Sequence, residues 1–191
     1  MASREITGLD GSLPTAERTS RTEAAFGAII TARATKFLAV FRVVLGFEFL
    51  WAFLDKTFGL GYATPAAKAW INGGSPTKGF LSRVAVGPLE GTFHTIAGAA
   101  WADWLFMAGL LGLGTALLLG VAMRLAAASG ALLLVLMWTV VLPPANNPFM
   151  DDHLVYAMLL VILAAAGAGT TLGLATTWGR IPLVRRHGWL R

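Results

Sequence analysis

The chain lacks cysteine entirely, and it is poor in histidine, with 3, and in charged residues, which make up 13% of its 191 residues. Without cysteine it cannot form disulfides, cysteine-ligated zinc sites or iron–sulfur clusters. Redox chemistry at this chain would therefore need a quinone, a histidine-ligated cofactor or a group on a partner protein. The sequence carries no recognisable haem, flavin or iron–sulfur motif, and no spacing that predicts a metal site.

Charge is missing above all from three long apolar runs, at residues 104–123, 125–142 and 154–174. Each run reaches the ~18–20 residues that a helix needs to cross a hydrocarbon core of ~30 Å. Only Arg124 separates the first two, and one helix over both would be far too long at ~1.5 Å per residue. We therefore expect a hairpin at residues 120–124. A further apolar run, 37–54, contains Arg42 and Glu48, and 56% of all residues are hydrophobic.

These runs predict an all-α membrane protein, an antiparallel four-helix transmembrane bundle with short extracytoplasmic helices between the first two spans. The transmembrane domain covers residues 35–176, with spans at about 35–56, 102–122, 124–142 and 152–174. A mobile N-terminal tail, residues 1–34, precedes it, and a basic tail, residues 177–191, follows. In the outer segment, residues 57–101, the pairs Thr64–Pro65, Ser75–Pro76 and Gly87–Pro88 each predict the start of a short helix.

Positive residues indicate the orientation. They gather in both tails and at Arg124, whereas the loop at residues 143–152 contains none. The positive-inside rule places both termini in the cytoplasm of a bacterial cell and both loops outside its cell membrane. The net charge of +5 then indicates contact with membrane lipid rather than with nucleic acid.

A charged side chain within a span costs roughly 3 kcal/mol or more unless it finds a partner, water or the interface. Arg42 has a structural explanation, because it can pair with helix-end carbonyls or reach the interface. Glu48 either forms hydrogen bonds inside the bundle or carries protons in a cavity that opens outward. Asp55 follows seven residues later on the same helix face, with Trp51 between them. Asp55 either joins this site or pairs with Lys56 at the interface.

The loops supply the remaining polar candidates. His94 and His153 both fall at the outer boundary, where each could hydrogen-bond a quinone carbonyl oxygen or, as an alternative, ligate a haem or a metal. Asp151 and Asp152 fall in the first turn of the fourth span, where the helix dipole favours acidic side chains. The alternative is that both join His153 in a functional site.

Two stretches of the chain resemble a known family. Residues 42–81, which include WINGGSP, and residues 146–179, which include NPFMDDH, are similar to the DoxX/DoxD group of small four-span membrane proteins of bacteria and archaea. In that family, DoxD is the membrane subunit of a thiosulfate:quinone oxidoreductase and acts beside a partner named DoxA. Other members are linked to membrane oxidoreductase assemblies concerned with thiol and oxidative stress.

The resemblance implies a lipid-accessible quinone site and an outer site for an anionic sulfur compound, in a complex with a redox or respiratory partner subunit. Two alternatives remain open, a noncatalytic accessory or assembly subunit of a respiratory complex and a small-solute carrier, although no inverted repeat is evident. The expected catalytic residues are Glu48, His94 and His153. The expected quinone or substrate contacts are Arg42, Trp51, Asp55, Lys68, Trp70, Asn72, Lys78, Arg83, Asp151 and Asp152. Among them, Lys68, Lys78 and Arg83 are expected to attract the anion at the outer site, with Trp70 and Asn72 shaping its pocket. The quinone is expected against the first span, near Glu48 and Trp51.

Overall fold

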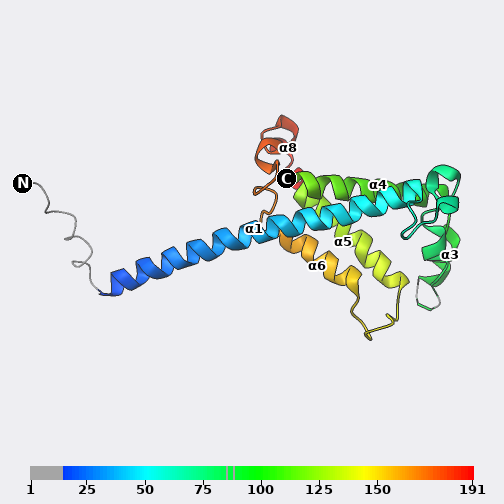
Figure 1. Cartoon of the computed structure of the whole chain (residues 1–191), viewed down its shortest axis with the longest axis horizontal. Helices are drawn as coiled ribbons and strands as arrows, with labels where there is room; N and C mark the ends of the chain where they lie inside the picture. The colour runs from blue at the N-terminus through cyan, green and yellow to red at the C-terminus, as the bar shows by residue number, and fades with distance from the viewer. Residues whose placement is uncertain (1–14, 85, 88) are drawn as a thin grey trace, which may run out of the picture.

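The computed structural model describes residues 15–84, 86–87 and 89–191, with side chains from residue 31 onward, and within these residues the chain is helical and contains no strand. The four longest helices are α1 (Thr15–Phe58), α4 (Ala100–Leu119), α5 (Met123–Val140) and α6 (Asp152–Ala165), as Figure 1 shows. Three of them are long and apolar enough to cross a membrane by length and composition, namely α4, α5 and the Thr31–Phe58 part of α1.

Helix α1 packs along α4, and α6 packs along α5. Figure 1 shows the N-terminal half of α1 extending well beyond the other helices. Residues 15–34, which the sequence analysis assigns to the N-terminal tail, continue this helix without a break, whereas residues 1–14 of that tail lie outside the described residues. The first helix therefore begins about twenty residues before the predicted start of the first span.

The hairpin between α4 and α5 agrees with the prediction. Helix α4 ends at Leu119, Gly120 takes a left-handed backbone conformation with φ of 67°, and α5 begins at Met123. Glycine adopts this conformation without the steric cost that a Cβ imposes, so the turn forms where the apolar run is interrupted. We call this side of the molecule the hairpin end.

The fourth predicted span differs from the structure. Helix α6 has 14 residues, about 21 Å at ~1.5 Å per residue, which is too short to cross a ~30 Å hydrocarbon core as a helix. It ends at Ala165, and Gly167 follows with φ of 64°. Residues 166–174, predicted to continue the span as a helix, instead form turns and bends. They reach the hairpin end, where the Leu174 amide donates to the Leu119 carbonyl of α4 at 2.8 Å. Hydropathy alone missed this because the segment is rich in glycine and threonine as well as alanine.

Short helices occupy both ends of the molecule. The end opposite the hairpin, which we call the loop end, carries η1 (Ala66–Lys68), η2 (Trp70–Asn72), α2 (Lys78–Leu81) and α3 (Glu90–Ile96). At the hairpin end lie α7 (Ala175–Trp178), α8 (Pro182–Arg186) and η3 (Gly188–Leu190), and the Arg191 carbonyl accepts a hydrogen bond from the Arg124 amide at 2.7 Å. The Ser75 hydroxyl accepts from the Lys78 amide at 3.1 Å, but α2 begins at Lys78 with Thr77 as its N-cap, two residues after the start that Ser75–Pro76 predicts.

Two glycines allow the backbones of α1 and α4 to approach closely. A Cβ added at Gly46 would lie 2.8 Å from the Leu118 nitrogen, and one added at Gly114 would lie 2.7 Å from the Leu50 nitrogen. Because Gly46 faces Leu118 and Leu50 faces Gly114, the two helices run antiparallel. Small residues at such contacts increase van der Waals packing between helices in a membrane.

We predict that Gly114→Ala destabilises the protein by roughly 1–3 kcal/mol, because the added methyl group meets the Leu50 backbone. The matched control is Gly112→Ala on the same helix, where an added Cβ meets nothing within 4 Å and alanine favours the helix. Denaturant titration in detergent micelles, followed by tryptophan fluorescence, measures both variants. Equal stability of the two variants would contradict the close approach.

Candidate functional site

A largely apolar cavity of about 480 Å³ lies between α4 and α5 and is covered by α2 and α3 at the loop end. We call it the apolar cavity. Among the described residues that line it, those with polar side-chain groups are Lys56, Thr77, Ser129 and Trp101, whose indole is mostly hydrocarbon. The Thr77 hydroxyl donates to Asp103, and the Ser129 hydroxyl donates to the Leu125 carbonyl, so neither offers a hydrogen-bond donor to a ligand. The cavity volume falls within the ~300–1,000 Å³ typical of small-molecule sites.

A second cavity of about 590 Å³ lies beside the first, within the segment that follows α1. Four cationic residues and no acidic residue are among those that line it, so we call it the cationic cavity. Such a site attracts anions, because it concentrates one sign of charge in a concave surface. Its charged and amide side chains are Lys56, Lys68, Asn72, Lys78 and Arg83.

The structure therefore brings together four residues that the sequence analysis assigned to an outer anion site, Lys68, Asn72, Lys78 and Arg83. Trp70, the fifth, is not part of either cavity wall. Its ring packs edge-on against Trp104 with centroids 4.6 Å apart, and it contacts the hydrophobic core. The polar contact of the Asn72 side chain is local, because its amide donates to the Ala66 carbonyl at 2.9 Å.

The two cavities share Lys56, Pro76 and Phe80 in their walls. The Lys56 ammonium group lies 5.9 Å from the centroid of the Phe106 ring, within the range of a cation–π contact. Among the described residues it forms no hydrogen bond or ion pair. Sequence reasoning missed Lys56 as a site residue because it expected a pair with Asp55.

Asp55 uses its carboxylate elsewhere. It accepts hydrogen bonds from the amides of Tyr62, at 3.3 Å, and Ala63, at 3.1 Å, and it is only 2% exposed. These bonds hold the chain that leaves α1 and so shape one side of the cationic cavity, which Ala63 lines. Asp55 is thus a positioning residue, and Lys56 lines both cavities without an ion pair among the described residues.

Asp103, which the sequence analysis did not single out, fixes the wall between the cavities. Its carboxylate accepts from the Ser75 hydroxyl at 2.9 Å, the Thr77 amide at 3.0 Å and the Thr77 hydroxyl at 2.6 Å. The Thr77 hydroxyl in turn accepts from the Gly98 amide at 3.2 Å. The sequence does show an acidic residue near the start of a span and two hydroxyl residues, Ser75 and Thr77, on either side of Pro76. It does not show that the carboxylate accepts from both hydroxyls, because that pairing depends on tertiary contact.

Arg42 is fully buried at the hairpin end, and backbone carbonyls surround its guanidinium group. Nε donates to Ala168 at 3.1 Å, Nη1 donates to Leu117 and to Leu118 at 3.0 Å, and Nη2 donates to Leu172 at 2.6 Å and Thr171 at 3.4 Å. A guanidinium has five N–H donors, so these five bonds leave none for a ligand. This geometry matches the structural explanation for Arg42, not the predicted quinone contact.

Glu48 and Trp51 line neither cavity. Glu48 lies between the levels of the Gly46–Leu118 and Leu50–Gly114 contacts, which places it near the hairpin end. Its side chain is exposed and has no partner among the residues described from position 31 onward. Trp51 packs against the rings of Phe47 and Tyr62, at 6.0 and 5.1 Å between centroids. The predicted quinone position beside Glu48 and Trp51 therefore differs from the position of the apolar cavity.

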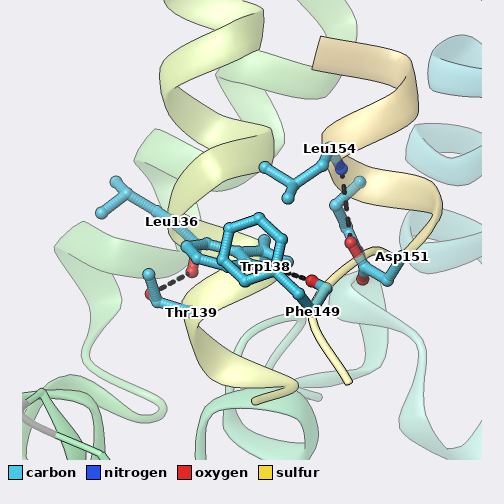
Figure 2. Close-up of polar contacts among 7 residues, drawn as sticks. Leu136, Trp138, Thr139, Phe149, Asp151 and Leu154 are labelled. Carbon is cyan, nitrogen blue, oxygen red and sulfur yellow. Dashed lines mark hydrogen bonds and ion pairs between the residues drawn. The ribbon is translucent and has the colours of Figure 1, made fainter. Parts of the chain in front are cut away.

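The loop between α5 and α6 holds His153 and the two aspartates. Asp151 caps α6, since its carboxylate accepts from the Leu154 amide at 3.3 Å, and its other oxygen lies 2.5 Å from Nδ1 of His153. Asp152 lies in the first turn, is exposed and lines neither cavity. Figure 2 shows Asp151 beneath Leu154, and the Trp138 indole donating to the Phe149 carbonyl, a bond of 2.8 Å that ties α5 to this loop. The acidic pair thus adopts the predicted helix-start positions.

The two histidines lie on different elements and line neither cavity. Nε2 of His94, on α3, donates to the Val84 carbonyl at 2.9 Å. The ring of His153 approaches that of Phe80, with centroids 6.2 Å apart, and Phe80 belongs to the walls of both cavities. The residues described from position 31 onward contain no group of three potential metal ligands. Each histidine thus has a neighbour in a cavity wall, Phe80 for His153 and the adjacent residue Phe93 for His94.

No protein-family model, curated protein or solved structure matches this chain. The resemblance to the DoxX/DoxD group thus stays a prediction from the two sequence stretches.

We predict that Arg42→Gln destabilises the protein by about 3 kcal/mol or more, because it removes most of the donors that satisfy buried carbonyls. Arg42→Lys should retain only part of the stability, since a lysine cannot reproduce the planar fork. Arg185→Gln, an exposed arginine at the same end, is the control and should stay within ~0.5 kcal/mol. Unfolding titrations in micelles measure all three. A stable Arg42→Gln protein would refute this role.

Proposed function

We propose that this chain is the membrane-embedded subunit of a quinone-linked oxidoreductase, with thiosulfate or a similar anionic sulfur compound as the electron donor. The apolar cavity would hold the quinone and the cationic cavity would receive the donor. The observation that carries the proposal is the shared wall of the two cavities at Lys56, Pro76 and Phe80.

The chemistry needs an anion and a quinone close together. Two thiosulfate ions form one new S–S bond to give tetrathionate and release two electrons. The quinone accepts both electrons and two protons and becomes a quinol. Lys56 would attract the donor from one side and donate a hydrogen bond to a quinone oxygen from the other, because this residue lines both cavities. His153, paired with Asp151, is the proposed route for protons from the loop end.

The arrangement in the membrane belongs to the same proposal. The loop end faces the outside of the cell, and both termini lie in the cytoplasm, as the distribution of positive residues predicts. Helix α6 and the turns that follow it complete a fourth crossing, since together they run from the loop end back to Arg42 at the hairpin end. A partner subunit contacts the donor side, as in the family that the sequence resembles.

One observation favours a second function, that of a noncatalytic accessory or assembly subunit of a respiratory complex. Glu48 is exposed on a face of α1 whose neighbouring side chains, Val44 and Phe47, are also exposed. A carboxylate that faces lipid is costly, and a polar or cationic group on a partner helix would satisfy it. Under this alternative Glu48 binds a polar or cationic group on a helix of a partner subunit, and neither cavity binds a reactant.

We predict that Gly109→Leu abolishes thiosulfate-dependent quinone reduction by membranes that contain this chain and its partner. Gly109 lines the apolar cavity, and a Cβ there would lie 3.7 Å from the Leu133 side chain, so a leucine would occupy quinone space. Gly112→Leu is the matched control, because it lies on the same helix with open space around it and outside the cavity wall. Quinol formation, followed by absorbance, measures both.

Retained activity in Gly109→Leu, with the protein folded, would rule out quinone in this cavity. A loss of activity in both variants would point to disturbed helix packing instead, and would count against the proposed site.

We predict that Glu48→Gln leaves quinone reduction within about twofold of the unmodified protein, since the Glu48 side chain is exposed and lines neither cavity. Mass spectrometry of proteins and quinone that co-purify in mild detergent separates the two functions. Loss of a co-purifying respiratory subunit on Glu48→Gln, with no bound quinone in either sample, would favour the accessory function. A tenfold or greater drop in activity with all partners retained would restore Glu48 as a proton carrier.

A further inference from the structure

The two cavities also adjoin as a polar and an apolar half of one region at the loop end. Lys56, Pro76 and Phe80 line both, so the two ends of one elongated molecule can lie on either side of this shared wall. Such a surface fits an amphiphile, because its head and its chain have opposite solvation requirements.

The polar half selects for negative charge. Lys56, Lys68, Lys78 and Arg83 line the cationic cavity, and no acidic side chain lines it. Two buried carboxylates, those of Asp55 and Asp103, accept hydrogen bonds from Tyr62 and Ala63 and from Ser75 and Thr77, respectively, and Asp55 attracts its neighbour Lys56. None of the four cationic groups forms an ion pair among the described residues, so the wall keeps a net positive charge and favours an anionic head group.

The apolar half suits a hydrocarbon chain. Apart from Lys56 at the shared wall, its polar groups are the indole N–H of Trp101 and the hydroxyls of Thr77 and Ser129, both of which already donate to oxygen atoms of the protein. The remaining wall consists of apolar side chains from α2 to α5 and Gly109. A chain in this space needs no hydrogen-bond partner, so burial of its apolar surface is favourable.

The depth of the two cavities matches that of a lipid. Helix α4 is 20 residues long, about 30 Å at ~1.5 Å per residue, and the cationic cavity lies at its loop end. Trp101 and Trp104, at the start of α4, are 59% and 66% exposed. Exposed tryptophans are enriched where hydrocarbon meets head groups. The loop end of the apolar cavity, which Trp101 lines, is thus at head-group depth, and this cavity extends along α4 to Leu113 at hydrocarbon depth. The cationic cavity adjoins it at Lys56, Pro76 and Phe80.

We propose that this chain binds one anionic phospholipid, with its head group in the cationic cavity and an acyl chain in the apolar cavity. The inference goes beyond the proposed redox function and rests on the geometry of the cavities alone. Quinone and the acyl chain need the same apolar space, so each excludes the other.

The test is native mass spectrometry of the full chain, released from micelles that contain phosphatidylglycerol and phosphatidylcholine with identical acyl chains. One phosphatidylglycerol per chain is expected, in preference to phosphatidylcholine. The triple variant Lys68→Gln/Lys78→Gln/Arg83→Gln should weaken this binding roughly 100-fold, because each lost cationic residue weakens the attraction to an anionic lipid by about fivefold. The triple variant Arg180→Gln/Arg185→Gln/Arg186→Gln changes the net charge equally at the hairpin end and should leave the binding unchanged.

Two further measurements test the contributions of the lipid's acyl chain and of its head group separately. Gly109→Leu should weaken phosphatidylglycerol binding roughly tenfold or more, because it fills space for at least two methylene groups, whereas Gly109→Ala should change it little. Soluble glycerophosphate should not displace the lipid. Equal retention of both lipids, equal loss in the two charge variants or displacement by glycerophosphate would each overturn the proposal. No quinone or electron donor is present, so a failure here is independent of the redox function.

Discussion

The hydrogen bonds of the Arg42 guanidinium group hold the hairpin end of the molecule together. Helix α4 ends within apolar surroundings, where its last four carbonyls need donors. Ala116 accepts from the Val121 amide, Leu119 accepts from the Leu174 amide, and Arg42 on α1 donates to Leu117 and Leu118. The same side chain donates to the segment after α6. One buried cation thus joins α1, α4 and the end of α6, which allows the apolar chain to turn without unsatisfied carbonyls at this point.

The opposite end of the molecule is built differently, and the candidate site follows from that difference. Helix α1 packs closely on α4 through Gly46 and Gly114, and Gly130 of α5 lies against Leu160 of α6. The hairpin joins these two pairs, and toward the loop end the space between α4 and α5 widens into the apolar cavity. Asp103, through Ser75 and Thr77, then holds the short helices over that space. The helices therefore pack tightly at the hairpin end, whereas at the loop end they leave the apolar cavity, which lies beside the cationic cavity.

The sequence predicted apolar helices long enough to cross a membrane and the hairpin at Gly120, and the described structure agrees with both. These two predictions succeeded because they depend on local composition and on glycine conformation. Lys68, Lys78 and Arg83, which are close in the sequence, line one cavity, while their role as an anion site stays a prediction. The sequence did not predict Asp103 as a fixed point of the site, since its partners lie more than twenty residues away. The sequence analysis also overestimated the length of α6, because hydropathy does not distinguish a glycine-rich apolar segment from a continuous helix.

The two charged residues of the first apolar run show where sequence information ends. The sequence by itself established that Arg42 and Glu48 needed an explanation, because charge is costly within a span. Only the tertiary structure decided that Arg42 is fully buried against five carbonyls while Glu48 faces outward, away from both cavities. The physical reason is that periodicity gives the direction of a side chain around its own helix, whereas the identity of what lies in that direction depends on how the other helices pack.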